Sequence, residues 1–181
     1  MRFPIRSLVA LLSLPLALCA CKDYPDVPAK PDGRLDRPYC NDPEAVNFNR
    51  NFPGYEDNNV CYYPADAFEG DFTFDDSIYD GAQKFIRAQK LQFSIAAEDK
   101  LRFRLSGFCP GGSTAIAFTA NRSLRADADT TAEKGQILCR QADTVSGYLS
   151  MAVFDSSRIR FFLTVISDTG TVYHQGTAFR R

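Results

Sequence analysis

Apolar and polar residues alternate along much of the chain beyond residue 68. In residues 100–105, KLRFRL, every second side chain is apolar, and the runs at 91–95 and 158–165 repeat this pattern. Successive side chains of a β-strand point to opposite faces, so the alternation indicates strands that bury only one face. Similar runs predict further strands at 70–79, 113–121, 135–141, 146–154 and 171–179.

Short polar links separate these runs, as expected for hairpins. Ala97–Asp99 is one such link, and residues 122–134 are expected to form one long polar loop. Residues 83–89 are compatible with a helix or a strand. Turns are expected at 110–112, 155–157 and 168–170. The spacing predicts an all-β domain, an antiparallel meander of about eight strands that forms a barrel or a sandwich.

The first 38 residues have a different pattern. Arg2 and Arg6 precede an apolar run from Leu8 to Leu18. A basic start followed by an apolar core of roughly 7–15 residues indicates a secretory signal peptide, because a spanning helix needs about 20 apolar residues. Residues 22–38 are rich in proline and lack apolar periodicity, which predicts a flexible tether.

Residues 18–21, Leu-Cys-Ala-Cys, resemble the lipobox of bacterial lipoproteins, which reads Leu-x-small-Cys. The resemblance implies cleavage after residue 20 and a palmitate-type lipid on Cys21, so that the protein contacts the membrane through its N-terminal lipid. Lys22 at the next position implies an outer-membrane destination. Lys22-Asp23 also partly resembles the signal that sends some Bacteroidota lipoproteins to the cell surface.

Composition narrows the classes of function. The chain has 21 basic and 22 acidic residues, and loss of Arg2 and Arg6 with the signal peptide leaves a charge of about −3. No segment has the basic surplus of a nucleic-acid-binding domain. A hydrophobic content of 45% with 15 Phe and 8 Tyr is sufficient for a real core.

The cysteines support export independently. Loss of Cys19 and lipidation of Cys21 leave four others, and an even number in an exported chain predicts disulfides. Zinc is the alternative, but no C-x-x-C motif is present and the sole histidine is distant in sequence. Of the three possible pairings, the favoured one keeps each bridge within one segment: Cys40–Cys61 and Cys109–Cys139.

Residues 39–66 form a separate segment rich in Asn and Asp. Such a small segment cannot fold by burial alone, and a disulfide between Cys40 and Cys61 would stabilise it. Residues 40–49 resemble the C-x-D-P-x-A-x-N-[YF]-N element of exported Bacteroidota proteins. Its oxygen-bearing side chains either bind calcium or only form turns. These side chains are Asp42, Asn47, Asn49, Asp57, Asn58 and Asn59.

Three motifs are weighed as sites of chemistry or modification. Asp168-Thr169-Gly170 matches the aspartic-protease triplet, but it lies between two alternating strands and is expected to be a hairpin turn. His174 is expected to be structural, since no serine elbow accompanies it. Thr130 and Thr144 lie in motifs that resemble the O-glycosylation pattern of the Bacteroidota and are expected to be exposed.

The sequence therefore predicts four regions with one leading function. The regions are a signal peptide at 1–20, a tether at 21–38, a Cys-stapled module at 39–66 and an antiparallel β-domain at 67–181. We expect a lipid-anchored envelope lipoprotein whose non-catalytic β-domain binds a protein, glycan or small molecule, and no nucleic acid. No cofactor is expected apart from calcium.

Two alternatives stay open. One is a carrier of a small apolar ligand, because Gly70-Asp71-Phe72 ahead of eight strands resembles the lipocalin type of barrel. The other is a hydrolase of unrecognised type. Residues 76–79 and 176–179 also resemble segments of uncharacterised β-rich lipoproteins of the Bacteroidota, a resemblance that implies no known activity.

Overall fold

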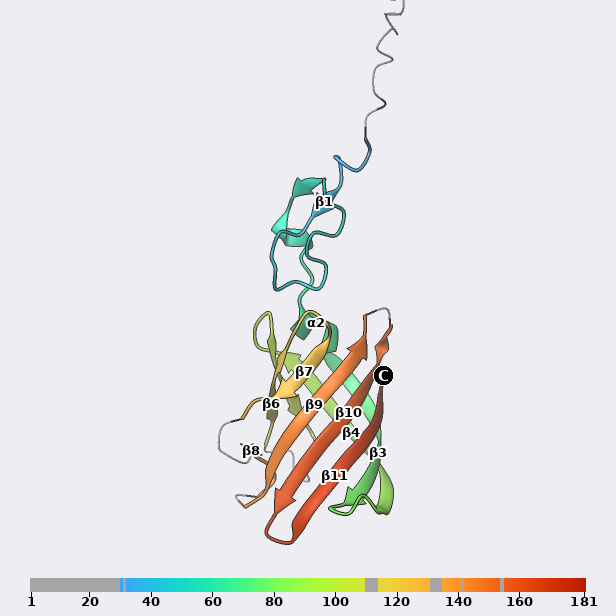
Figure 1. Ribbon diagram of the computed structural model, residues 1–181, viewed down its shortest axis with the longest axis vertical. Coiled ribbons are helices and arrows are strands. Elements are labelled where there is room, and N and C mark those ends of the chain that lie inside the picture. Colours follow the sequence, from blue (N-terminus) through green and yellow to red (C-terminus); the bar gives the residue numbers. More distant parts are fainter. Residues whose placement is uncertain (1–29, 31, 110–113, 131–134, 141, 154) are drawn as a thin grey trace, which may run out of the picture. The chain divides into compact units, whose positions relative to one another are not determined.

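Eight antiparallel strands close into a barrel, and one further short strand pairs beside it (Figure 1). The computed structural model describes residues 30, 32–109, 114–130, 135–140, 142–153 and 155–181. The barrel strands are β3 (Gly70–Asp80), β4 (Phe85–Ala97), β5 (Arg102–Ser106), β6 (Ile116–Ala120), β7 (Arg125–Ala128), β9 (Thr144–Ala152), β10 (Asp155–Ser167) and β11 (Gly170–Arg180). The short strand β8 (Gln136–Ile137) pairs with β9.

The strands follow one another around the ring, which is the predicted meander. Each barrel strand pairs with the next along the chain, and β11 pairs with β3 to complete the ring. The all-β antiparallel fold is therefore confirmed, and the barrel is the observed form of the two left open. The predicted signal peptide, Cys21 and the predicted tether up to residue 29 lie outside the described residues.

Two local predictions were wrong. The expected loop at 122–134 contains β7, which pairs with both β6 and β9. Alanine is a poor strand former, so the sequence RADA carries a weak local signal and its neighbours determine its conformation. The expected turn at 155–157 instead begins β10, where a register shift between Asp155 and Ile159 absorbs the polar residues.

Residues 85–89, which were compatible with a helix or a strand, belong to β4. Of the strand expected at 135–141, the described residues 135–140 form only β8. The turn at 110–112 lies outside the residues that the structure describes.

Phenylalanine rings fill the middle of the barrel. Phe161 stacks on Phe74 with ring centroids 4.4 Å apart and contacts Phe93 at 5.1 Å. Phe103 and Phe118 stack at 5.4 Å on neighbouring strands. Burial of each ring contributes about 1.5–3 kcal/mol, so this cluster supplies much of the apolar driving force for folding.

A one-turn helix, α2 (Pro64–Phe68), lies across one end of the barrel. Phe68 is fully buried and stacks on Phe103 with ring centroids 5.0 Å apart. Arg180, near the end of β11, donates from Nη2 to the carbonyl of Ala67 at 2.8 Å and from Nη1 to the carbonyl of Glu69. A cation there satisfies carbonyl groups that the helix leaves unpaired.

Two inward positions on the strands require glycine. A Cβ atom on Gly176 would lie 1.9 Å from the carbonyl oxygen of Asp75 on the paired strand. Gly147 has a φ of +124°, and a Cβ there would lie 2.1 Å from the carbonyl oxygen of Phe162. Glycine at such positions lets strands bend and approach closely, as closure of a small barrel demands.

No helix among the described residues is long and apolar enough to cross a bilayer.

The close approach at Gly176 predicts a stability effect. Gly176→Ala should lower the free energy of unfolding by about 1–3 kcal/mol, because the backbone at Asp75 must move to admit the methyl group. Gly81→Ala is the matched control, since its nearest neighbour would be the carbonyl oxygen of Thr171 at 3.7 Å, an ordinary contact. Urea denaturation measures both, and equal stabilities would contradict the argument.

Candidate functional site

The stapled module is built from turns around one disulfide. Cys40 and Cys61 are bonded, as predicted. β1 (Pro38–Tyr39) pairs in parallel with β2 (Tyr55–Glu56), and a short 3-10 helix, η1 (Asn58–Val60), leads to the second cysteine. The amide of Tyr55 also donates to the carbonyl of Arg37, so regular structure begins before residue 39.

The oxygen-rich side chains of the module form its turns. Asn47 Oδ1 accepts from the amide of Tyr62, and its Nδ2 donates to the carbonyl of Val60 at 2.7 Å. Asp57 caps η1 by accepting from the amide of Asn59, and Asn49 adopts a φ of +55°. No group of three or more His, Cys, Asp or Glu side chains gathers as a metal site within the described part of the chain. Calcium binding stays a prediction.

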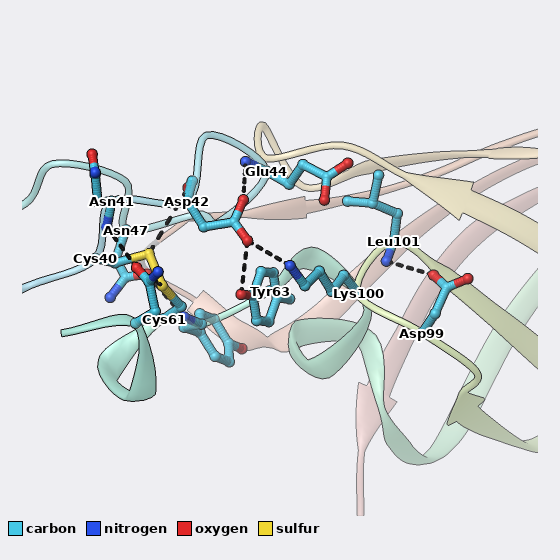
Figure 2. Close-up of polar contacts among 12 residues, drawn as sticks. Cys40, Asn41, Asp42, Glu44, Asn47, Cys61, Tyr63, Asp99, Lys100 and Leu101 are labelled. Carbon is cyan, nitrogen blue, oxygen red and sulfur yellow. Dashed lines mark hydrogen bonds and ion pairs between the residues drawn. A yellow bond between two sulfur atoms is a disulfide. The ribbon is translucent and has the colours of Figure 1, made fainter.

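Asp42 joins the module to the barrel (Figure 2). Its Oδ2 atom accepts from Lys100 Nζ at 2.6 Å and from the hydroxyl of Tyr63 at 2.9 Å, while Oδ1 accepts from the amide of Glu44. Lys100 Nζ also lies 4.8 Å from the centre of the Tyr63 ring. The three side chains Asp42, Tyr63 and Lys100, called the joint below, link segments 58 residues apart.

The electrostatics of the joint follow from these contacts. The hydrogen bond from Lys100, with a smaller contribution from the Glu44 amide, lowers the pKa of Asp42 from 3.8 to about 2. The same bond raises the pKa of Lys100. Asp99 accepts from the amides of Leu101 and Arg102, which lowers its own pKa and fixes the turn that presents Lys100. The joint is therefore an ion pair at neutral pH.

A buried polar cluster lies inside the barrel at the β3–β11 pairing. Asp76 Oδ2 lies 2.8 Å from His174 Nδ1 and accepts from Gln89 Nε2 at 2.9 Å. The imidazole is only 9% exposed and its ring meets that of Phe108 edge-on. Asp76 Oδ1 is buried with no hydrogen-bond partner among the described residues. His174 thus points into the barrel.

A hollow of about 450 Å³ lies on the outer face of β9, β10 and β11. It combines two arginines, two hydroxyl-bearing residues and an exposed phenylalanine. Next to it, Tyr148 and Phe162 stack with ring centroids 5.0 Å apart, and the Arg125 guanidinium lies 3.7 Å from the centre of the Tyr148 ring. The residues that line the hollow are Ser150, Met151, Ala152, Asp155, Arg158, Arg160, Thr177 and Phe179.

The remaining sites predicted from the sequence are scattered. The second bridge, Cys109–Cys139, is formed as predicted, with Cys109 buried and Cys139 exposed. Thr130 is exposed, but the Oγ1 atom of Thr144 is buried. The expectation that Thr144 exposes its hydroxyl was therefore wrong, because this residue sits at the start of β9. Glycosylation itself stays a prediction. Asp168–Gly170 forms the expected hairpin turn between β10 and β11.

Comparison with protein-family models gives no match, and no curated protein matches the sequence. Among solved structures, a redesigned β-barrel is similar at 17% sequence identity and a TM-score of 0.39. The alignment covers 65% of this chain and 95% of the redesigned barrel.

The joint predicts a pH dependence. Asp42 has a lowered pKa in the folded protein, so its ionised form stabilises the fold above about pH 4, and this contribution is lost as the pH falls through about 2. Lys100→Met should return the pKa of Asp42 toward 3.8 and flatten the stability curve between these pH values.

A carboxyl-carbon NMR titration measures the pKa of Asp42 directly. Lys90→Met is the matched control, because Lys90 pairs with Asp75 on the barrel instead. An Asp42 pKa that is the same in wild type and Lys100→Met would refute the ion pair.

The buried cluster predicts a non-additive pair of variants. His174→Leu should cost about 3 kcal/mol of unfolding free energy, because the buried Asp76 side chain loses one of its two partners and keeps only Gln89. Adding Asp76→Val should recover most of this loss, since the polar group is then replaced by apolar volume. Urea denaturation of the two single variants and the double variant tests this, and simple addition of the two losses would contradict it.

Proposed function

We propose that the chain is a lipid-anchored lipoprotein of the bacterial outer membrane, exposed at the cell surface, whose β-barrel is a non-catalytic binding module. The basic and apolar pattern of residues 1–18, the lipobox at Cys21 and Lys22 after it support the anchor. Two disulfides in one short chain fit an oxidising envelope compartment.

The filled interior of the barrel is the observation that supports binding on its outer surface. A carrier of the lipocalin kind holds its ligand within the barrel, which requires space between the strands. Here the inward positions bear phenylalanine rings in mutual contact, and α2 lies across one end. The proposed binding surface is accordingly the outside of the barrel.

Residues 22–66, between the proposed lipid and the barrel, are suited to act as a spacer. A proline-rich tether follows Cys21, and the stapled module then bonds to the barrel through Asp42, Tyr63 and Lys100. The joint links the module to the barrel, and the proline-rich composition of the tether supports its role as the flexible part of the proposed stalk. A binding surface on such a stalk reaches partners beyond the lipid headgroups.

Replacement of the lipidated cysteine tests the anchor. Cys21→Ser should lose incorporation of radiolabelled palmitate and should leave the membrane fraction on cell fractionation, because no thiol remains for acylation. Cys19→Ser is the matched control and should keep both properties, since residue 19 is removed with the signal peptide. A Cys21→Ser protein that still carries palmitate would overturn the proposal.

A further inference from the structure

We infer that the hollow on the outer face of β9, β10 and β11 binds a phosphate group attached to a ring-bearing or apolar moiety. This inference names a ligand class for the proposed binding module and rests on that function only in treating the barrel as a binding protein. It is carried by two arginines, two hydroxyls and one exposed aromatic ring in the same hollow.

The strand register brings the donor groups together. Arg158 and Arg160 are two residues apart on β10, so their side chains project from the same face of the sheet and their Cα atoms are about 6.6 Å apart. Arg160 lies opposite Thr177 on β11 and opposite Ser150 on β9. Arg160 is thus flanked on both neighbouring strands by a residue whose hydroxyl group can donate a hydrogen bond.

The positive charge in the hollow is only partly neutralised by the protein. Arg160 forms no ion pair within the described part of the chain, and Arg158 Nε lies 3.7 Å from Asp155 Oδ2, with both side chains largely exposed. Asp155 already accepts from the amide and the hydroxyl of Ser157, which hold its pKa low. Asp155 is therefore ionised, and two guanidinium groups beside one carboxylate leave the hollow with a surplus of one positive charge.

The acidic side chains on the neighbouring strands do not neutralise this surplus positive charge. Arg125, across Ser150 from Arg160, is paired with Asp127 at 2.8 Å. On the other side, Asp75 lies across Thr177 and is paired with Lys90 at 3.1 Å. These two carboxylates are therefore already paired, and an external anion is the complementary charge.

The number of donors favours phosphate over carboxylate. One guanidinium satisfies both oxygens of a carboxylate through two parallel hydrogen bonds. Two guanidinium groups with two hydroxyls offer more donors than a carboxylate needs, whereas a phosphate ester presents three strong acceptor oxygens and up to two charges.

The rest of the hollow suits a larger molecule than inorganic phosphate. Its volume of about 450 Å³ falls in the range of sites for small organic ligands. Phe179, which lines the hollow, is 42% exposed, and Ala152 adds apolar surface. An aromatic ring in that position stacks on a flat or apolar group next to the phosphate.

Phenyl phosphate tests the inference, with inorganic phosphate as the comparison. The full-length lipidated protein in nonionic detergent micelles should bind phenyl phosphate more tightly than inorganic phosphate, as followed by calorimetry and by the NMR signal of the Arg160 Nε–H group. Arg160→Gln should weaken binding by about tenfold or more, because it removes a charged donor. Added salt should weaken binding in wild type.

Arg87→Gln is the matched control. It removes one exposed positive charge from β4, outside the hollow, and should leave the affinity unchanged. If Arg87→Gln weakens binding as much as Arg160→Gln, the effect is one of net charge and the site is refuted. Absence of phenyl phosphate binding to wild type would refute it also.

Phosphatidylglycerol in the micelles distinguishes the sources of the phosphate. A response of the Arg160 signal to this lipid assigns a membrane headgroup, whereas a response to phenyl phosphate alone assigns a soluble ester, and either result supports the site. Membrane retention of the Arg160→Gln protein is measured in parallel. If the wild-type protein is retained in the membrane but does not bind phenyl phosphate, only this inference is overturned. The Cys21→Ser result concerns only the anchor.

Discussion

The pairing of the first barrel strand with the last, β3 with β11, is the contact on which the fold depends. It removes the two free edges that a meander would otherwise expose. Aromatic packing, the buried Asp76–His174 pair and the close approach at Gly176 all converge on these two strands. Arg180 extends the same strand to hold α2 in place. The strand that closes the barrel, β11, therefore also holds the helix that covers its end.

The strand pattern was predictable because it is local. Alternation identifies a strand with one buried face, and it placed β3, β10 and β11 within a few residues. The choice between barrel and sandwich was beyond local reasoning, since both bury one face of each strand. That choice depends on the register between β3 and β11, about 100 residues apart. β7 was missed because its alanines pack well only beside the neighbouring strands.

The same distinction separates the predictable sites from the others. Each disulfide lies within one segment, and spacing was enough to choose the pairing. The joint links Asp42 to Lys100, and nothing in the sequence around either residue indicates that the two side chains meet. Arg158 and Arg160 were visible as outward residues of a strand, but their hydroxyl neighbours and the occupied carboxylates beside them emerge only from the register of five strands.

The bond between Arg180 and α2 has a consequence for the timing of assembly. The helix ends at residue 68, yet its carbonyl group at Ala67 accepts its side-chain hydrogen bond from Arg180, more than 100 residues later in the chain. During synthesis the growing chain therefore holds an unpaired edge on β3 until β11 has emerged. Such long-range closure is slow compared with hairpin formation and leaves the nascent chain open to aggregation. A chaperone that shields β3 until β11 is available would shorten that exposed interval.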